Sequence, residues 1–266
     1  MKNNALIKIV VCILALMLMT ALLCACSNHD EPDFPDETPS PEPVVSSEPV
    51  PEDTSEPTPA ELPTELPECD DAGEGYIDRL TFIGDSTTYG LKAYSVIDAS
   101  QVWTPSSGTL ALFNQSFATI VYPATGEEIP IVDAVTAAKP EYLVLTIGVN
   151  GVSMMDEAAF KADYIDLIGR IKAASPDTKI ICNSIYPVEA SYEAKGNGIN
   201  NEVIERANGW ILQIAEETGT HFTNSASVLK GADGKLIHEY GNGDGLHLSP
   251  EGFNAVLNYL RTHAWL

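Results

Sequence analysis

The chain has 266 residues, of which 44% are hydrophobic, and 38 acidic residues against 14 Lys or Arg give it a formal net charge of −24 at pH 7. A chain this acidic is not expected to bind nucleic acid or another polyanion through its overall charge. Its composition changes twice along the sequence, and these changes divide it into residues 1–25, 26–75 and 76–266.

The first segment, residues 1–25, has the pattern of a secretory signal. Lys2 and Lys8 are followed by a long apolar run that ends at Leu23-Cys24-Ala25-Cys26. This ending resembles a bacterial lipobox, which implies cleavage before Cys26 and lipid on its thiol and new amino group. An uncleaved membrane anchor is the alternative, because the run is near the lower length limit for a spanning helix. Both interpretations predict a chain tethered to the extracellular face of a bacterial cell membrane.

The second segment, residues 26–75, is expected to be a disordered acidic stalk. Residues 27–75 hold 11 of the 18 prolines and 16 of the 38 acidic residues, and no Lys or Arg. So few apolar side chains cannot bury enough surface to offset the entropy lost on ordering. Proline and charge repulsion should keep the segment extended. The third segment keeps 22 acidic residues against 12 Lys or Arg, so it is acidic as well.

The third segment, residues 76–266, is long enough for one sizeable core. In chain order, apolar runs predict strands within 80–86, 141–148 and 178–187, with a last short strand within 221–229. Helical spacing predicts helices over 155–174, 199–218 and 248–264. Between the first two strands, alternation in Thr109–Phe113 and Phe117–Tyr122 beside a turn signal at 123–126 predicts a small antiparallel β insertion around 100–132.

Strands that alternate with helices predict an α/β fold with a mostly parallel sheet between two helical layers. In such a sheet, ligands bind at the carboxyl ends of the strands. Polar residues occupy these places: Asp85 and Ser86 follow the first strand, Asn150 follows the second, and Asp244 and His247 precede the last helix. The sequence therefore predicts that three distant clusters meet in one pocket.

The residue types in these clusters suit acyl transfer. A serine nucleophile needs a base beside it, and the base needs a partner that fixes its tautomer; Ser86, His247 and Asp244 supply these types. Asp244 and His247 are three residues apart in a turn, so both side chains can lean the same way. The developing oxyanion needs donors, which the backbone after the first strand and the side chain of Asn150 can provide.

The chain resembles the SGNH (GDSL-type) hydrolases in three sequence blocks. Their counterparts here are Gly84-Asp85-Ser86-Thr87-Thr88-Tyr89-Gly90, Gly148-Val149-Asn150 and Asp244-Gly245-Leu246-His247. The resemblance covers about residues 76–266 and implies a flavodoxin-like, three-layer α/β/α sandwich that hydrolyses esters without a metal or cofactor. It also implies Ser86 as nucleophile, His247 as base and Asp244 as its orienting partner. The oxyanion hole would combine the Ser86 N–H, a second-block glycine N–H and the Asn150 side chain.

The sequence departs from this family pattern in two places. Gly151 stands where the family usually has Asp after the third-block Asn. The second-block glycine is also not evident. Gly108 follows the candidate second strand and is the preferred assignment, whereas Gly126 fits a hairpin turn more simply.

Other chemistries lack their signatures in this sequence. There is no Gly-x-Ser-x-Gly elbow, no His, Cys and carboxylate set at zinc spacing, and no glycine-rich phosphate loop. Cys69 and Cys182, the two cysteines beyond residue 26, lie in segments of different character, and a bridge between them is not expected.

The expected function is that of a cell-surface serine esterase that removes short acyl groups, such as acetyl, from glycans. A lysophospholipase or lipase-like esterase is the first alternative, although residues 100–132 are only moderately apolar and contain no long apolar lid. A non-catalytic glycan-binding lipoprotein is the second alternative. It is disfavoured because all four catalytic residue types are present. The expected partners are thus an acylated glycan and, through the lipid anchor, the membrane.

Overall fold

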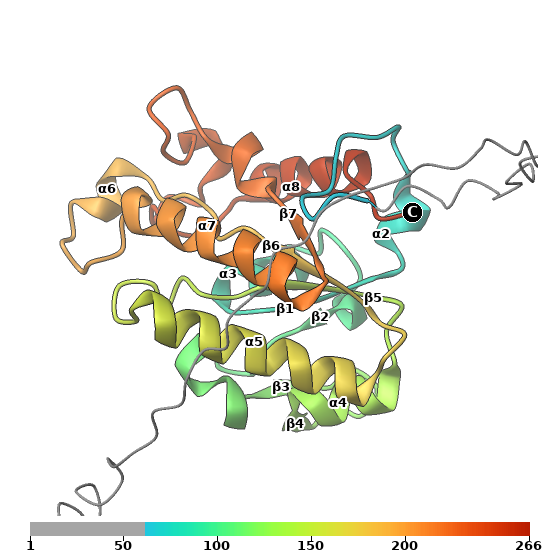
Figure 1. Ribbon diagram of the computed structural model, residues 1–266. Coiled ribbons are helices and arrows are strands. Elements are labelled where there is room, and N and C mark those ends of the chain that lie inside the picture. Colours follow the sequence, from blue (N-terminus) through green and yellow to red (C-terminus); the bar gives the residue numbers. More distant parts are fainter. Residues whose placement is uncertain (1–61) are drawn as a thin grey trace, which may run out of the picture. The chain divides into compact units, whose positions relative to one another are not determined.

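The computed structural model describes residues 62–266. The predicted signal segment, Cys26 and the stalk up to residue 61 lie outside the described residues. A five-stranded sheet with the order β2-β1-β5-β6-β7 forms the centre, and every neighbouring pair is parallel (Figure 1). Its strands are β1 (Leu80–Gly84), β2 (Val102–Trp103), β5 (Tyr142–Thr146), β6 (Lys179–Asn183) and β7 (His221–Thr223).

Helices cover both faces of this sheet, and in Figure 1 the long helices α5 and α7 lie side by side. One face carries α4 (Ile131–Ala138), α5 (Glu157–Ala174) and α7 (Asn201–Thr218). The other carries α2 (Glu74–Ile77), α3 (Ser86–Ala93) and α8 (Pro250–Thr262). The short helices are η1 (Ala99–Gln101), η2 (Leu112–Phe117), α6 (Ala190–Glu193), η3 (Ser225–Leu229) and η4 (His238–Tyr240). The α/β sandwich expected from the sequence is confirmed.

The central strands contribute to two separate hydrophobic cores. In β1, Phe82 packs into the core under α8 and the next residue, Ile83, packs into the core under α5. In β5, Val144 packs into the core under α8 and Leu145 packs into the core under α5. Successive side chains of a strand point to opposite faces, so a strand covered on both sides is apolar throughout. This explains why the sequence shows continuous apolar runs here rather than alternation.

The antiparallel insertion is present but smaller than predicted. Strand β3 (Thr119–Val121) pairs with β4 (Glu128–Pro130) across a turn in which the Gly126 N–H donates to the Tyr122 carbonyl at 2.8 Å. The predicted strand at Thr109–Phe113 is wrong.

In its place the chain is irregular and then enters η2. Gln115 of η2 donates to Asp166 of α5 at 2.8 Å, a tertiary contact that local alternation does not reveal. Helix α4 was also not predicted. Its buried Ile131, Ala134 and Val135 have helical spacing over only two turns, which is too short a stretch to separate from the strand signal before it.

Residues 62–75, predicted to belong to the stalk, pack against the domain instead. The Leu66 N–H donates to the Phe222 carbonyl at 2.9 Å, and the Phe222 N–H donates to the Thr64 carbonyl at 2.7 Å. The segment therefore pairs with β7 and covers an edge of the sheet that would otherwise expose unpaired backbone groups. The side chain of Leu66 is only 2% exposed. An open strand edge and one apolar anchor thus order a segment whose composition predicts disorder.

Replacing Leu66 with alanine is expected to lower the free energy of unfolding by about 2–4 kcal/mol, because it leaves a cavity in a packed core. Leu62→Ala is the matched control, since Leu62 is 38% exposed and its loss is expected to change stability by less than about 0.5 kcal/mol. Urea unfolding of the two full-length variants measures the difference. Equal midpoints would mean that Leu66 is not part of the cooperative core.

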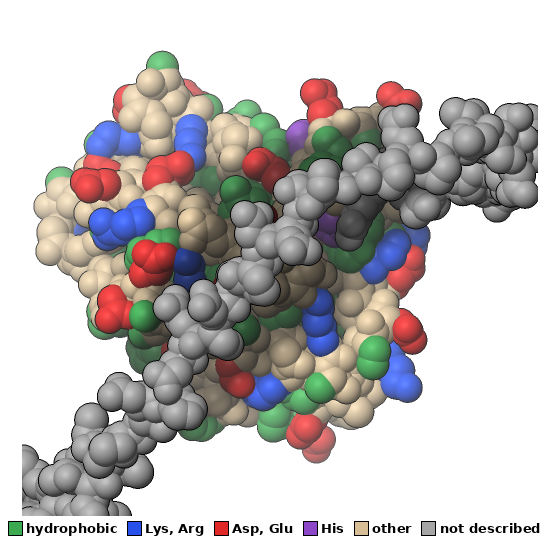
Figure 2. All heavy atoms as spheres, in the orientation of Figure 1, with side chains coloured by type: hydrophobic (Ala, Val, Ile, Leu, Met, Phe, Trp, Pro, Cys, Tyr) green, Lys and Arg blue, Asp and Glu red, His purple; other side chains and the backbone are tan. Residues whose placement is uncertain are grey.

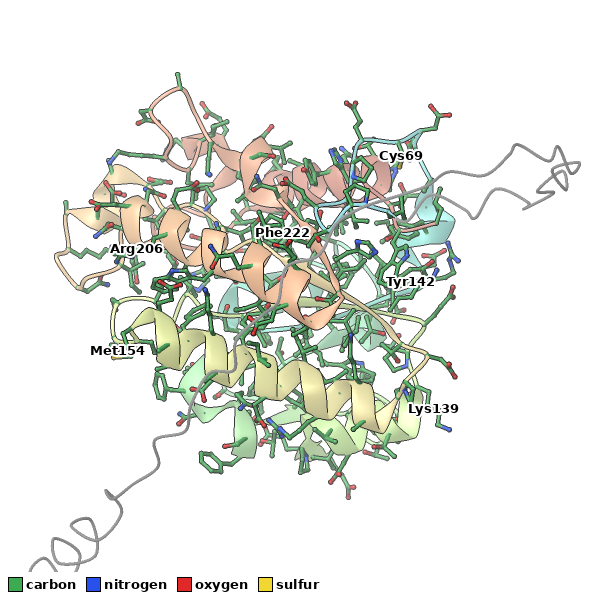
Figure 3. All side chains as sticks on the ribbon, in the orientation of Figure 1. Cys69, Lys139, Tyr142, Met154, Arg206 and Phe222 are labelled. Carbon is green, nitrogen blue, oxygen red and sulfur yellow. The ribbon has the colours of Figure 1, made fainter. Side chains whose placement is uncertain are left out.

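Both described cysteines are free thiols. Cys69 lies beside the end of α8, where its sulfur accepts a hydrogen bond from the Ala264 N–H at 3.3 Å (Figure 3). Cys182 is buried in β6, and this burial raises the pKa of its thiol to about 11. A thiol with so high a pKa is almost entirely protonated at neutral pH, which makes it unreactive.

The surface of the described part is mixed in charge on the face seen in Figure 2, where Lys and Arg side chains are interspersed with Asp and Glu. Within residues 62–266, no helix combines the length and the apolar composition needed to cross a membrane.

Candidate active site

Ser86 is placed at the carboxyl end of the central sheet by an abrupt change from strand to helix. Strand β1 ends at Gly84 and α3 begins at Ser86. Asp85 between them is the N-cap, and its carboxylate accepts from the Thr87 N–H at 2.9 Å and the Thr87 hydroxyl at 2.7 Å. A Cβ at position 84 would lie 2.6 Å from the Thr146 carbonyl oxygen, so only glycine fits beside β5. The Ser86 N–H occupies the first helical position, where no intrahelical acceptor exists.

The side chains of Ser86, His247 and Asp244 form one chain of hydrogen bonds. Nε2 of His247 lies 2.8 Å from Oγ of Ser86, and Nδ1 lies 2.6 Å from Oδ2 of Asp244. The fold thus joins two residues that are 161 positions apart in the sequence. A carboxylate only accepts, so Nδ1 donates to Asp244 and Nε2 is left to accept the Ser86 proton. This arrangement can activate a serine nucleophile.

Asp244 is held in its charged form. Burial opposes its ionisation, but the hydrogen bonds from the His247 ring and from the N–H groups of His247 and Leu246 outweigh this and lower its pKa to about 2. The two backbone bonds, at 2.9 and 2.7 Å, both reach Oδ1, which leaves Oδ2 for the imidazole. A permanent negative charge at this point stabilises the imidazolium that forms when His247 takes a proton.

The other two predicted oxyanion donors, Asn150 and Gly108, differ in whether an N–H is left free. Asn150 follows β5, and its Nδ2 donates to the Leu110 carbonyl at 3.0 Å. An amide nitrogen carries two hydrogens, so one N–H of Asn150 can still donate elsewhere. The Gly108 N–H, in contrast, donates to the Pro105 carbonyl at 2.9 Å, in a turn where Gly108 has a φ of +71°. The structure therefore accounts for Gly108 as a turn residue and leaves it no free N–H for an oxyanion.

Asp85 is the one fully buried carboxyl group next to the site. Its Oδ2 has no hydrogen-bond partner among the described residues. Burial raises its pKa to about 6, against the opposing effect of the two hydrogen bonds from Thr87 and the nearby His247. Asp98 offers a comparison, because it accepts from the N–H and hydroxyl of Ser100 in the same way but is exposed, and its pKa is lowered.

Asp85→Asn is expected to change how stability depends on pH. The unfolded chain releases this proton near pH 3.8 and the folded chain near pH 6, so the folded state loses up to about 3 kcal/mol as the pH rises between these values. A neutral amide removes this dependence. Urea midpoints at pH 4, 5 and 7 should therefore show that the stability of the Asn variant increases relative to that of the unmodified protein as the pH rises.

Asp98→Asn is the control for this prediction. Its lowered pKa contributes stability above pH 3.8, which is lost only as the pH falls through the folded pKa, so the variant should not gain between pH 4 and 7. If the urea midpoints of Asp85→Asn and of the unmodified protein changed equally with pH, Asp85 would not titrate in this range.

A layer of buried polar side chains connects the strand ends beneath the site. Asn183 of β6 donates to the Thr146 hydroxyl of β5 at 3.1 Å, and its side-chain oxygen accepts from the Ser225 hydroxyl at 2.6 Å. These bonds link β5, β6 and the segment after β7 at the end where Ser86 lies. The sequence shows these residues only as polar positions at the ends of apolar runs.

The turn that carries Asp244 and His247 is held by the segment around α6. The Glu189 N–H donates to the Gly245 carbonyl at 2.9 Å, and Nζ of Lys195 donates to the Asp244 carbonyl at 2.9 Å. Both contacts reach backbone atoms of the turn, so they fix its position without competing for the Asp244 carboxylate.

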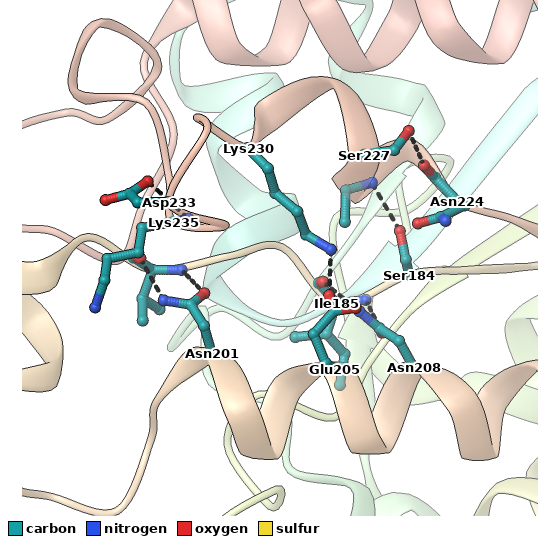
Figure 4. A network of polar contacts seen from close by, with 12 residues as sticks. Ser184, Ile185, Asn201, Glu205, Asn208, Asn224, Ser227, Lys230, Asp233 and Lys235 are labelled. Atoms are coloured by element: carbon teal, nitrogen blue, oxygen red, sulfur yellow. Dashed lines mark hydrogen bonds and ion pairs between the residues drawn. The ribbon is translucent and has the colours of Figure 1, made fainter.

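Helix α7 in turn holds the chain that leads into this segment (Figure 4). Asn208 accepts from the Ile185 N–H at 2.7 Å and donates to the Ile185 carbonyl at 3.0 Å. Asn201, two helical turns earlier, makes the same pair of bonds with Val188 at 2.9 and 2.8 Å. The two amides replace strand pairing for an irregular stretch. The sequence does not reveal this role of the two amides, since their spacing of seven shows only that they share a helix face.

A pocket of about 250 Å³ opens beside Ser86 and His247. Most of its wall is apolar and aromatic, and the residues that define it are Ser86, Tyr89, Tyr94, Asn242, His247 and Phe253. The aromatic wall of this pocket was not predicted from the sequence. A signal existed, because Tyr89, Gly90 and Ala93 follow Ser86 at helical spacing and so share its face of α3. Among residues 62–266, no group of three His, Cys, Asp or Glu side chains is arranged to hold a metal ion.

Comparisons with known proteins bear on the family and the fold of this chain. The model of the GDSL-like lipase/acylhydrolase family matches residues 82–255. The structure is similar to that of a candidate platelet activating factor from Streptococcus pneumoniae, with a TM-score of 0.51 and 21% identity over 69% of this chain and 82% of that one. It is also similar to a candidate acylhydrolase from Bacteroides fragilis NCTC 9343, with a TM-score of 0.50 and 18% identity over 74% and 89%. No curated protein sequence matches significantly.

The two structural similarities are of low sequence identity and bear on the fold. The family match spans well over half of the chain and runs from β1 to α8, so it includes Ser86, Asn150, Asp244 and His247. The prediction of an SGNH (GDSL-type) hydrolase is thereby confirmed: the chain belongs to the GDSL-like lipase/acylhydrolase family and is a carboxylic ester hydrolase.

Proposed function

We propose that this ester hydrolase is a lipid-anchored serine esterase of the cell surface that removes acetyl groups from glycans. One observation carries the catalytic part of the proposal. Ser86, His247 and Asp244 form an unbroken hydrogen-bonded chain, with distances of 2.8 Å and 2.6 Å, at the carboxyl end of the sheet. A hydroxyl, an imidazole and a charged carboxylate aligned in this order suit a serine nucleophile that is activated by a general base.

In the first half of the reaction, Oγ of Ser86 attacks the ester carbonyl carbon while Nε2 of His247 takes the hydroxyl proton. The carbonyl oxygen becomes an oxyanion, which the Ser86 N–H and the second N–H of Asn150 are suited to stabilise. The bond between the carbonyl carbon and the leaving oxygen then breaks. Nε2 of His247 returns its proton to that oxygen, so the free alcohol leaves and the acyl group stays on Ser86.

In the second half, water attacks the acyl carbon and gives one proton to Nε2 of His247. The bond to Oγ of Ser86 breaks, and Oγ takes this proton back as the carboxylic acid leaves. Asp244 keeps its charge throughout, which its pKa of about 2 permits at neutral pH. The balance is one ester and one water consumed, and one alcohol and one acid released.

Two features support the substrate and the location. Tyr89 and Tyr94 at the wall of the pocket beside Ser86 are each more than 40% exposed, which suits a substrate that reaches the site from outside the protein. The lipobox-like ending at Cys26 and the acidic, proline-rich residues after it support a tethered domain that extends from the membrane.

A panel of esters tests this proposal on the full-length protein. Acetylated xylan and 4-nitrophenyl acetate should both be hydrolysed, and the rate on 4-nitrophenyl esters should fall as the acyl chain grows beyond four carbons. Highest rates on long-chain esters or on a lysophospholipid would replace the glycan assignment with the lipase-like alternative. Glycan binding without turnover would instead favour a binding protein.

A further inference from the structure

The position of the pocket beside Ser86 indicates which part of the ester it receives. His247 must deliver its proton to the leaving oxygen from Nε2, the atom 2.8 Å from Oγ of Ser86, so the leaving alcohol lies on the His247 side. Both Ser86 and His247 line this pocket, whereas the oxyanion candidate Asn150 does not. The pocket therefore receives the alcohol part of the ester, and the acyl group points away from it.

The chemistry of the wall indicates which alcohol fits. Tyr94 is 43% exposed and its ring centroid is 6.3 Å from that of Phe253, at an angle of 48° between the rings. Tyr89 adds a second exposed ring from α3, the helix that ends just before Tyr94. Position 90 has to be glycine for this wall to form, because a Cβ there would lie 2.5 Å from the Phe253 ring. The rings of Tyr89 and Tyr94 offer flat apolar surfaces, and each ring has a hydroxyl group at its edge.

A neutral amide borders this aromatic wall, and the Lys92 ammonium, 5.1 Å from the Tyr89 ring centroid, does not line the pocket and donates to the Val102 carbonyl at 3.3 Å. The side-chain oxygen of Asn242 accepts from the Asp244 N–H at 3.0 Å, which leaves the Asn242 amide hydrogens for a ligand. No Lys or Arg side chain lines the pocket, so it offers no counter-charge for a phosphate headgroup. Its volume of about 250 Å³ lies below the roughly 300–1,000 Å³ typical of sites for drug-sized ligands, which suits a single ring.

We propose that Tyr89, Tyr94, Phe253 and Asn242 form a leaving-group site for a neutral sugar ring, whose apolar face packs on the aromatic side chains and whose hydroxyls bond to Asn242. This inference rests on the proposed function, because it takes the leaving alcohol to be protonated by His247. It goes further by assigning the specificity for the alcohol to the wall formed by α3 and α8.

Acetate esters that differ only in their alcohol test the proposal. On the full-length protein, Tyr94→Ala should lower kcat/KM for a mono-acetylated methyl pyranoside at least tenfold more than for ethyl acetate, mainly through KM. Tyr94→Phe keeps the ring and should retain most of the preference. Phe113→Ala is the matched control, since Phe113 is also 43% exposed and does not line this pocket; both rates should stay unchanged.

Three kinetic results would overturn the proposal: an equal loss on both esters in Tyr94→Ala, no loss on either, or faster hydrolysis of cyclohexyl acetate than of the pyranoside. A binding measurement separates this inference from the proposed function. The Ser86→Ala variant should bind unacetylated methyl pyranoside, detected by saturation-transfer NMR, and Ser86→Ala with Tyr94→Ala should bind it at least tenfold more weakly. Absent hydrolysis with this binding intact would refute the esterase mechanism and leave the sugar site standing; equal binding by both variants would refute the sugar site.

Discussion

Replacing Ser86 with alanine is expected to lower kcat for ester hydrolysis at least about 10,000-fold, with KM changed little. The reason is that the variant has no oxygen 2.8 Å from Nε2 of His247, so no acyl-enzyme can form. Hydrolysis of 4-nitrophenyl acetate, followed by absorbance, measures kcat. Labelling by a fluorophosphonate reagent provides a second readout and should be lost in the same variant.

Ser227→Ala is the matched control for this experiment. Ser227 is exposed on η3 and donates to the Asn224 carbonyl, so its loss removes a hydroxyl without touching the site. This variant should keep its rate and its labelling. His247→Ala should lose as much activity as Ser86→Ala, and the double variant should lose no more, because the two side chains act as one unit. Additive losses, or a rate in Ser86→Ala above about one hundredth of the original, would contradict Ser86 as nucleophile.

Asp244→Asn is expected to lower kcat by about 10,000-fold while the fold is retained. Asn can still accept from the backbone N–H groups of Leu246 and His247 through its oxygen. Its NH₂ group would then face Nδ1 of His247 where Oδ2 now stands 2.6 Å away. A donor at that place requires Nδ1 to accept, so the ring proton moves to Nε2. The base then faces Ser86 with a proton already bound and cannot take another.

Asp233→Asn provides the control for the same chemical change in a loop. The Asp233 carboxylate also accepts from a backbone N–H two residues later, that of Lys235 at 3.2 Å, but it contacts no catalytic side chain. Its activity should remain within a factor of about two. Thermal unfolding of both variants checks that the fold is intact. Near-normal kcat in Asp244→Asn with a normal fold would show that the carboxylate does not set the tautomer of His247.

The three residues that the structure brings into one hydrogen-bonded chain could be found from the sequence because their signals are local. Asp244 and His247 lie in one turn, where the carboxylate both caps backbone N–H groups and reaches the ring, so a spacing of three is enough to predict their contact. Ser86 is recognisable since it follows a buried strand and begins a helix. Their meeting across 161 positions could also be predicted, because the carboxyl ends of parallel strands lie at one edge of a sheet.

Features that depend on the folded conformation of a loop or on a partner far along the chain were not predictable. Gly108 is the preferred second-block glycine by sequence, yet its N–H is already bonded to Pro105 three residues earlier, and only the folded turn shows this. The aromatic wall of the pocket combines Tyr94, which follows α3 directly, with Phe253 from α8, and neither segment reveals the other. Leu66 lies in a segment whose composition predicts disorder, and what orders it is the open edge of β7.

The sequence by itself thus determined the class of fold, the family and the three residues aligned for catalysis. These follow from periodicity along strands and helices and from the chemistry of short motifs, both of which act over a few residues. The tertiary structure decided where the domain begins, which donors are free to meet an oxyanion and what shape lies beside the serine. Those properties depend on the folded conformation of loops and on packing between distant segments. A backbone N–H or an aromatic ring is available to a substrate only when no other part of the chain has already bound or covered it.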